Sequence, residues 1–499
     1  MKKNLDTPKI LEELFSNNWK EEFIFDALED RVLTYEDFFC AVLNCRNRLE
    51  DNGLGKDDIV CLLMPNSLDL VILYFACLFM QITIVPVDPN KGEDEIREIL
   101  SLINYKYIIC DTQDIYSKEK QLAINELKED FYRKRENSIN ELNNFYNIDY
   151  NKLFIITFTS GSTGIPKGVM HSFNNLILSA DAFWEKFNFG KENMFYHNLP
   201  MTYMAGIINL IILPLISNSK IVIGERFNIS NIMRFWDIPI KYSVNTFWFI
   251  PTVISLLMKL DRGTKGIDYA KEAEIIGCVG TAHLNNQLKR SFEERYKIPL
   301  YESYGLSETL FVTTNYPEMQ VLENSVGQVL EGVELDFDED DEILIDVPWM
   351  FLGYSNIEID SYLKDGKFKS GDLGKFDKNG FLEITGRKKD LIIRGGINIS
   401  PKKIEDFISK FNIFEDKVIL GFEDIYIGEK IVCFFIPDKE FFSESKKREL
   451  NNEITKKLGK DYCIDEFVKM AEFPKNINGK IDKLKIKEIY KVKMNAHIQ

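Results

Sequence analysis

Short apolar runs alternate with longer helical patterns along the N-terminal part of the chain. Six runs are rich in β-branched and other apolar residues: Ile59 to Leu63, Ile82 to Val87, Tyr107 to Cys110, Phe154 to Thr159, Lys220 to Ile223 and Ile275 to Val279. Strands that alternate with helices predict parallel sheets covered on both faces. We therefore expect an α/β fold with a large N-terminal domain of sheets covered by helices.

One apolar stretch, Leu70 to Val87, approaches the length that spans a bilayer. Polar residues and Pro86 interrupt its second half, which does not suit a membrane span. The periodicity favours a buried helix over Ser67 to Met80, followed by a strand over Ile82 to Val87. We therefore expect no integral membrane segment.

Polar and charged residues dominate the stretch from Thr112 to Lys152. It includes helical patterns such as Lys118 to Arg135. A long polar stretch between apolar runs is typical of a connection on the surface. We expect this segment to cover the surface and to contribute little to the core.

The pattern changes after about residue 325, where short strands and turns replace the longer helices. Asp365-Gly366 and Asn379-Gly380 are typical of tight reversals, and the acidic run from Asp336 to Glu342 is most simply a solvated turn. A compact segment with predicted strands over Lys417 to Gly421 and Ile431 to Ile436 follows. It indicates a small C-terminal α+β domain, which we expect to begin near residues 387–390.

Composition limits the classes of function. The chain has 499 residues, 45% of them hydrophobic and 28% charged, which suits an ordinary multidomain protein. The net charge of −16 argues against broad contact with nucleic acid or anionic lipid, because both require a basic surface. Eight scattered cysteines form no Cys-x-x-Cys pair, and the N-terminus lacks the apolar stretch of a signal peptide. These features predict reduced thiols and a cytoplasmic location.

A loop rich in glycine and hydroxyl groups follows the predicted strand at Leu153 to Thr157. The residues expected to surround phosphate are Thr159, Ser160, Gly161, Ser162, Thr163, Gly164 and Lys167. Glycines let backbone amides converge on an anion, and lysine adds a full positive charge. The alternative interpretation is a flexible turn without a ligand. Because Pro166 precedes Lys167 and Gly168 follows it, the order does not match the phosphate loop of nucleotide kinases.

Together with four further strings, this loop resembles the adenylate-forming superfamily of acyl- and aryl-CoA synthetases, luciferases and peptide-synthetase adenylation domains. The five strings occur in the family's order: Thr159 to Gly168, Tyr304 to Thr309, Ser370 to Asp372, Gly386 to Asp390 and Pro474 to Lys480. The resemblance extends from about Leu33 to Lys485. It implies ATP as a substrate, with Mg²⁺, and CoA as the co-substrate.

The resemblance also implies roles for individual residues. Tyr304 and Ser307 belong to the nucleotide-binding motif, and the tyrosine offers a flat face to adenine. Glu308 is implied to be a metal ligand and a catalytic residue, since its carboxylate is a hard oxygen ligand for Mg²⁺. Asp372 accepts hydrogen bonds from ribose hydroxyls, and Arg387 donates to ribose or phosphate oxygens. Taken singly, each residue would be assigned a structural role.

Two further roles concern the C-terminal part of the chain. Lys480 is implied to bridge the carboxylate and the α-phosphate, where a lysine stabilises developing negative charge. Considered alone, it would be one solvated lysine of a basic tail. Asp390 corresponds to a hinge, so the domains are expected at 1–386 and 391–499 with a hinge at 387–390. Gly395-Gly396 is implied to line a pantetheine tunnel, with an ordinary turn as the alternative.

Departures from the family pattern bear on the substrate. Tyr203 stands where many relatives have histidine, and no aspartate is present nearby to pair with an amino-acid ammonium group. Gly305 stands where acetate-specific relatives have tryptophan, which favours a longer acid. Tyr203, Trp248, Gly280 and Gly305 are the candidate pocket residues, for an apolar acyl or aryl acid. The glycine-poor stretch from Asp336 to Asp346 is a further departure.

The implied reaction is attack of a carboxylate on the α-phosphorus of ATP, which gives acyl-AMP and pyrophosphate. A thiol, of CoA or of a separate carrier protein, then takes the acyl group. No Leu-Gly-x-Asp-Ser carrier motif is fused to the chain. A P-loop ATPase and a non-catalytic relative are the other hypotheses, and retention of Lys480, Glu308 and Asp372 argues against the second.

Overall fold

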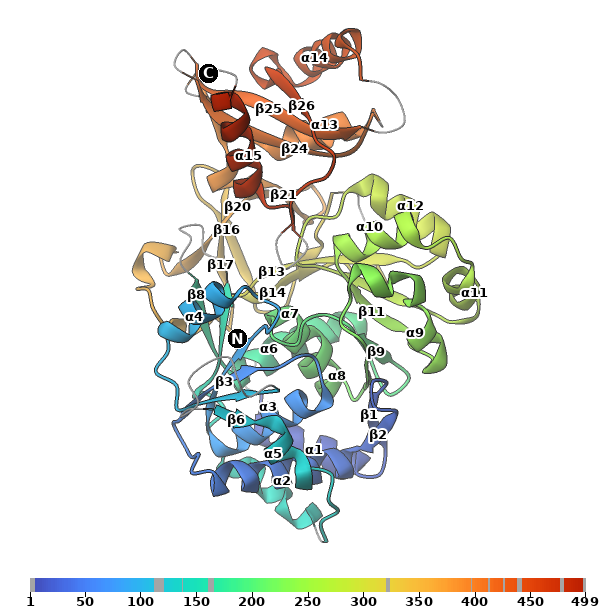
Figure 1. Ribbon diagram of the computed structural model, residues 1–499, viewed down its shortest axis with the longest axis vertical. Helices are drawn as coiled ribbons and strands as arrows, with labels where there is room; N and C mark the ends of the chain where they lie inside the picture. Colours follow the sequence, from blue (N-terminus) through green and yellow to red (C-terminus); the bar gives the residue numbers. More distant parts are fainter. Residues whose placement is uncertain are drawn as a thin grey trace.

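The computed structural model describes most of the chain. The described ranges are 5–111, 121–136, 138–159, 166–319, 324–395, 397–411, 413–424, 427–437, 442–475 and 480–496. The N-terminal residues form a large body of mixed sheets and helices, and the C-terminal elements stand apart from it at one end (Figure 1). This division agrees with the expected large N-terminal and small C-terminal domains.

The first sheet has seven strands in the order β18-β8-β7-β4-β3-β5-β6. Their bounds are β3 (Ile59–Leu63), β4 (Thr83–Val87), β5 (Tyr107–Cys110), β6 (Gln121–Ala123), β7 (Leu153–Thr159), β8 (Lys167–Ser172) and β18 (Gly353–Tyr354). All five residues of β4 are buried, as a parallel strand covered on both faces requires. The strands from β7 to β6 are parallel, whereas β8 runs antiparallel to both β7 and β18.

The second sheet has nine strands in the order β15-β14-β13-β12-β11-β9-β10-β1-β2. Their bounds are β1 (Glu22–Asp26), β2 (Arg31–Thr34), β9 (Met194–His197), β10 (Lys220–Ile223), β11 (Thr246–Phe249), β12 (Ile276–Val279), β13 (Leu300–Leu306), β14 (Leu310–Thr314) and β15 (Gln328–Val329). The neighbouring strands β13-β12-β11-β9-β10-β1 of this sheet are connected by parallel pairings. The predicted parallel α/β sheets are therefore confirmed.

Helices fill the space around these sheets. They are α1 (Thr7–Asn18), α2 (Tyr35–Asp51), α3 (Leu68–Met80), α4 (Glu93–Ser101), α6 (Phe173–Phe187), α7 (Met204–Ile207), α8 (Leu213–Ile216), α9 (Asp237–Lys241), α10 (Pro251–Leu260), α11 (Lys265–Glu272) and α12 (Asn286–Tyr296). A π-helix, η4 (Ile208–Ile212), joins α7 to α8. The apolar α3 begins at Ser67, whose hydroxyl accepts a hydrogen bond from the Leu70 amide, and ends at left-handed Gln81. It is the buried helix that the sequence predicts, and among the described helices none combines the length and hydrophobicity needed to cross a bilayer.

A third sheet, β16-β17-β20-β19 with β21 beside β20, precedes the C-terminal domain. The strands are β16 (Glu334–Phe337), β17 (Glu342–Asp346), β19 (Leu363–Lys364), β20 (Lys367–Phe376) and β21 (Leu382–Arg387). The reversals at Asp365-Gly366 and at Asn379-Gly380 connect antiparallel strands, with positive φ at both glycines, as predicted.

The C-terminal domain has a sheet of its own, β23-β22-β25-β24 with β26 beside β25. Its elements are β22 (Ile392–Arg394), β23 (Ile397–Ile399), α13 (Pro401–Ser409), β24 (Phe414–Asp424), β25 (Gly428–Pro437), α14 (Glu444–Leu458), β26 (Glu466–Lys469) and α15 (Lys483–Ala496). Alternate residues of β24 and β25 face two separate apolar clusters: Ile419 and Ile431 lie in one, and Val418 and Val432 lie in the other. Helices therefore cover both faces.

The expected surface helix over Lys118 to Arg135 is wrong. Its described part contains β6, the single turn α5 (Ile124–Leu127) and a 3-10 turn. Phe131, together with Phe145 further along, is fully buried in the main core. The i, i+4 spacing of apolar residues in this segment is also typical of a surface helix, but here these side chains pack at the edge of the first sheet.

The acidic run from Asp336 to Glu342 is a turn, as predicted, but it is only partly solvated. It forms the reversal between β16 and β17, and Lys388 lies against three of its carboxylates, those of Asp338, Asp340 and Glu342. The Asp338 and Glu342 side chains are only 6% and 4% exposed. A cation distant in sequence thus explains the clustering of acids, which composition alone could not reveal.

Candidate active site

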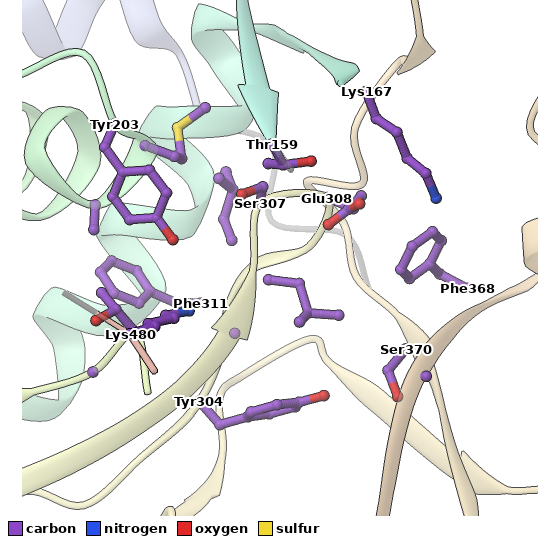
Figure 2. Close-up of a pocket in the computed structure, with 18 of the residues that line it drawn as sticks. Thr159, Lys167, Tyr203, Tyr304, Ser307, Glu308, Phe311, Phe368, Ser370 and Lys480 are labelled. Carbon is purple, nitrogen blue, oxygen red and sulfur yellow. The ribbon is translucent and has the colours of Figure 1, made fainter. Parts of the chain in front are cut away.

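One cavity of about 950 Å³ opens between the large domain and the C-terminal domain. The sequence-predicted residues that line it are Thr159, Lys167, Tyr203, Trp248, Gly280, Tyr304, Gly305, Ser307, Glu308, Arg387 and Lys480. Figure 2 shows Tyr203 and Lys480 on one side and Lys167 and Ser370 on the other, with Thr159, Ser307 and Glu308 between them. The motifs are distant in sequence, yet the fold brings them around one space.

The expected phosphate loop joins β7 to β8. Thr159 ends β7 and Lys167 begins β8, while Ser160, Gly161, Ser162, Thr163 and Gly164 lie outside the described residues. The helix α6 follows, with Ser172 as its N-cap, but an antiparallel strand lies between the loop and this helix. The loop therefore closes a hairpin, which differs from the strand-to-helix turn of a P-loop.

Lys167 is fixed by two tyrosines. Its Nζ donates to the Tyr362 hydroxyl 2.7 Å away and lies 4.2 Å from the centre of that ring. The Tyr354 ring is 5.5 Å away. A buried ammonium group held by neutral partners keeps its charge available to an anion in the cavity.

Ser307 and Glu308 follow the end of β13. His171 Nε2 lies 2.7 Å from the Ser307 carbonyl oxygen, and burial lowers the pKa of His171 to about 4, so the neutral ring donates this bond. The Tyr354 hydroxyl donates to Glu308 Oε1 at 2.7 Å. These two bonds orient the Glu308 carboxylate in the cavity.

Three of the sequence-predicted residues form a triad centred on the buried Asp372. The Tyr304 hydroxyl donates to Asp372 Oδ2 at 3.0 Å, and Arg387 Nε lies 2.8 Å from Asp372 Oδ1. Burial raises the pKa of Asp372, and Arg387 opposes that effect. Asp372 does not line the cavity but lies behind it, where it holds the two side chains that do.

Lys480 lines the cavity from the C-terminal domain, as does Lys475, and it lies two residues before Asp482, which precedes α15. Burial and the nearby positive charge of Arg387 together lower the pKa of Lys480 to about 8, while Asp372 acts in the opposite direction. Residues 476–479 before it lie outside the described residues. An ammonium group so placed gains from any negative charge that enters.

The four candidate pocket residues, Tyr203, Trp248, Gly280 and Gly305, all line the cavity. Gly305 has a structural reason to be glycine, because a Cβ there would lie 1.8 Å from the Leu310 carbonyl oxygen. Its missing side chain thus accommodates β14, and room for the acid comes from the wall that contains Trp248 and Gly280.

The hinge candidate lies outside the cavity. Asp390 ends the 3-10 turn η7 (Lys388–Asp390), and its Oδ2 accepts from Lys483 Nζ at 2.6 Å. Gly395 has a positive φ of 57°, and its N–H donates to the Ile427 carbonyl oxygen, so it makes a tight turn. Gly396 lies outside the described residues.

Sequence reasoning missed several residues of the site. Tyr354 fixes Glu308, and Tyr362 fixes Lys167. His171 fixes Ser307, and Asn209 lines the cavity. Each is an uncharged residue within an apolar or turn-rich segment, where the local pattern carries no chemical signal. Only their positions in the fold reveal them.

The donor set suits a metal that arrives with its substrate. Within the described ranges no three His, Cys, Asp or Glu side chains converge to hold a metal ion. Mg²⁺ commonly binds through one or two carboxylates together with phosphate oxygens, so the single carboxylate of Glu308 fits such an ion.

Comparisons with known proteins agree with this geometry. Residues 16–355 match the family model described as AMP-binding enzyme. A 2-succinylbenzoate–CoA ligase from Listeria innocua is 26% identical over 468 residues, covering 93% of this chain and 95% of its own. A malonate–CoA ligase from Arabidopsis thaliana is 27% identical, covering 67% of this chain and 60% of its own.

Solved structures share the fold over almost the whole chain. ATP-bound MatB from Rhodopseudomonas palustris has a TM-score of 0.82 at 20% identity and covers 97% of this chain and 99% of its own. The o-succinylbenzoate CoA synthetase from Bacillus subtilis, in complex with its acyl-adenylate intermediate, has a TM-score of 0.79 at 22% identity. That match covers 96% of this chain and 98% of its own.

Proposed function

We propose that this chain, which belongs to the AMP-binding enzyme family, is an AMP-forming acid–thiol ligase that converts a carboxylic acid into its CoA thioester. The observation that carries the proposal is the convergence of Lys167, Glu308 and Lys480 around one cavity large enough for a nucleotide and an acid. The relatives' names, all CoA ligases, support the same activity and favour CoA over a carrier protein as the acceptor.

In the first half-reaction, an oxygen of the carboxylate forms a bond to the α-phosphorus of ATP, and the bond to pyrophosphate breaks. Lys480 neutralises charge between the carboxylate and the α-phosphate, and Lys167 neutralises charge on the departing pyrophosphate. Glu308 would hold Mg²⁺, which supplies further charge neutralisation on the phosphates. Tyr304 and Arg387, fixed by Asp372, position the nucleoside.

In the second half-reaction, the CoA thiolate attacks the acyl carbon, and AMP leaves with its phosphate oxygen. We assign residues 1–386 to nucleotide and acid binding, 387–390 to the hinge and 391–499 to the mobile domain that supplies Lys480. Rotation about Asp390 would withdraw Lys480 and admit the thiol. None of the eight cysteines, all of which are described, forms a disulfide, and this favours a reducing compartment such as the cytoplasm.

The test is the release of pyrophosphate and AMP from ATP across a panel of acids, with and without CoA. Release that depends on the acid and is accelerated by CoA supports the ligase. Release that CoA leaves unchanged points to a carrier protein as acceptor, and ADP as the product contradicts adenylation altogether.

A further inference from the structure

The acyl side of the cavity is built from elements that contribute polar atoms but no formal charge. They are α7, the π-helix η4, the ends of β11 and β12, and Ser303 at β13. The charged residues that line the described cavity come from other segments: α4 and the residues before it, β8, the loop after β13, the third sheet with the turn that follows it, and the C-terminal domain. The acid therefore meets a neutral wall.

Trp248 on β11 carries an unused hydrogen-bond donor at this wall. The side chain is 3% exposed, and its ring packs against Phe183 and Phe311 with centroids 5.4 and 5.5 Å apart. Its Nε1 has no hydrogen-bond partner among the described residues. A buried indole N–H normally finds an acceptor, because leaving it unpaired forfeits the bond it made to water.

The neighbouring residue, Gly280, keeps the space beside this donor clear. A Cβ at Gly280 would lie 3.3 Å from Trp248 Nε1 and 3.1 Å from Ser303 Oγ. The next residue, Thr281, lines the cavity with a φ of 72°, a conformation that β-branched residues rarely adopt. A strained backbone, a glycine and an unpaired donor thus meet at one point of the cavity wall.

Asn209 contributes a second polar group to the same side. It is 4% exposed, lies within η4 and lines the cavity. A π-helix turn is frequent at functional sites, because its extra residue re-aims the side chains. The wall therefore has the composition of a recognition surface for a polar but uncharged group.

Resting on the ligase function proposed above, we propose that the cognate acid carries a neutral oxygen acceptor in its acyl part, a keto, hydroxyl or ether group, received by the Trp248 indole N–H. A second carboxylate is disfavoured, because the described residues of this wall include no cation and Lys480, on the side of Tyr203 (Figure 2), is assigned to the reacting carboxylate. The substrate class is thus an oxygen-bearing aryl or acyl acid. A plain hydrocarbon acid leaves the donor unpaired and is used less well.

The experiment compares acids that differ only in this oxygen. Valerate, levulinate and glutarate form one series with a methylene, a keto group and a carboxylate, and phenylbutyrate and benzoylpropionate form an aryl pair. Benzoate with its three hydroxy derivatives samples other positions of the oxygen. The readout is kcat/KM for acid-dependent pyrophosphate release, and we expect the best oxygen-bearing acid to exceed its plain partner about tenfold.

Trp248→Phe removes the N–H and keeps an aromatic ring. We expect it to reduce the preference for the oxygen-bearing acid to about one, whereas Trp184→Phe keeps the preference, because the Trp184 indole donates to the Phe189 carbonyl oxygen away from the cavity. Gly280→Ala crowds the same donor without removing it and should lower the preference in the same direction. If near-UV circular dichroism shows that Trp248→Phe does not fold, the preference measured with Gly280→Ala decides whether this donor recognises the acid.

The outcomes separate the two proposals. Equal use of plain and oxygen-bearing acids, or a preference that survives both Trp248→Phe and Gly280→Ala, overturns the assignment and leaves the ligase function intact. A preference for glutarate over levulinate overturns the proposal that the acceptor group of the acid is neutral. Absence of pyrophosphate release with every acid overturns the ligase function itself and the assignment with it.

Discussion

At the scale of single residues, the site depends on side chains whose neighbours change their chemistry. Lys480 lies in a buried setting beside Arg387, and both effects favour its neutral form. Binding of the ATP phosphates reverses that balance, because negative charge beside Lys480 favours the ammonium form. In the free protein the surroundings of Lys480 thus disfavour its charged form, and the bound substrate makes that form favourable.

Lys480→Ala should reduce acid-dependent pyrophosphate exchange about 10² to 10³-fold, because it removes a positive charge from the reacting phosphate. The assay follows exchange of labelled pyrophosphate into ATP. Lys485→Ala is the matched control, since Lys485 belongs to the same segment but is exposed on α15. Full exchange in Lys480→Ala would contradict the assigned role.

The dependence of kcat/KM on pH should reflect the protonation of Lys480. Because the pKa of Lys480 is about 8 before the substrate binds, kcat/KM for ATP should fall as pH rises above about 8, where the lysine loses its proton. Lys480→Arg keeps its charge throughout this range and should remove the alkaline decline, although its absolute rate is lower. A wild-type profile that stays flat to about pH 9.5 would show that another group carries the charge.

At the scale of elements, the hairpin of β16 and β17 fixes the start of the proposed hinge. Its carboxylates surround Lys388, which directly follows Arg387 of the nucleotide site. In the proposed rotation, residues up to 388 therefore stay with the large domain, and the change of backbone angles is assigned to Lys389 and Asp390. The pivot is restricted to two residues by an interaction that the acidic run supplies.

Lys388→Met should lower the free energy of unfolding of the large domain by about 3 kcal/mol, because it leaves two buried carboxylates without their cation. Lys364→Met is the control, since its partner Glu339 is 87% exposed and the pair contributes less than about 1 kcal/mol. Urea denaturation at pH 7 measures both. The pKa of Asp338 is lowered, so this stabilisation is lost as pH falls below the ordinary value of 3.8, and the two proteins should converge there.

Strands and motifs were predictable from the sequence where the signal is local. The run from Ile82 to Val87 became β4, and the apolar stretch before it became α3, because burial on all sides requires continuous apolar residues. The pairing of Lys388 with its acids and that of Tyr354 with Glu308 could not be predicted. Each joins residues more than 40 positions apart, and no local pattern specifies such contacts.

At the scale of the whole molecule, the described residues of the two domains meet through polar contacts that are mostly at the surface. Lys259 pairs with Glu415 at 2.6 Å, His283 Nε2 lies 3.6 Å from Asp406, and Asn285 donates to Ser409. Next to the linker, Ser400 and Lys402 donate to backbone carbonyl oxygens of β21. Water can replace these partly exposed partners at low cost. The pose that places Lys480 in the cavity is therefore reversible.

Asp390→Pro should preserve adenylation and lower thioester formation at least tenfold, because proline fixes φ at the proposed pivot while Lys480 already lies in the cavity. Pyrophosphate exchange and acyl-CoA production are measured on the same preparation. Asp390→Ala removes the ion pair with Lys483 but leaves the backbone free, so it should retain both half-reactions. Equal loss of both in Asp390→Pro would point to misfolding rather than a blocked rotation.

The placement of the cysteines bears on the fate of an activated acyl group. An acyl-adenylate reacts with any accessible thiolate, including those of the enzyme that forms it. Seven of the eight cysteines are buried, and burial raises the pKa of the Cys61 thiol to about 12 and that of Cys45 well above its ordinary value. The enzyme is thus protected against self-acylation, and the lifetime of its intermediate is set by the arrival of an outside thiol.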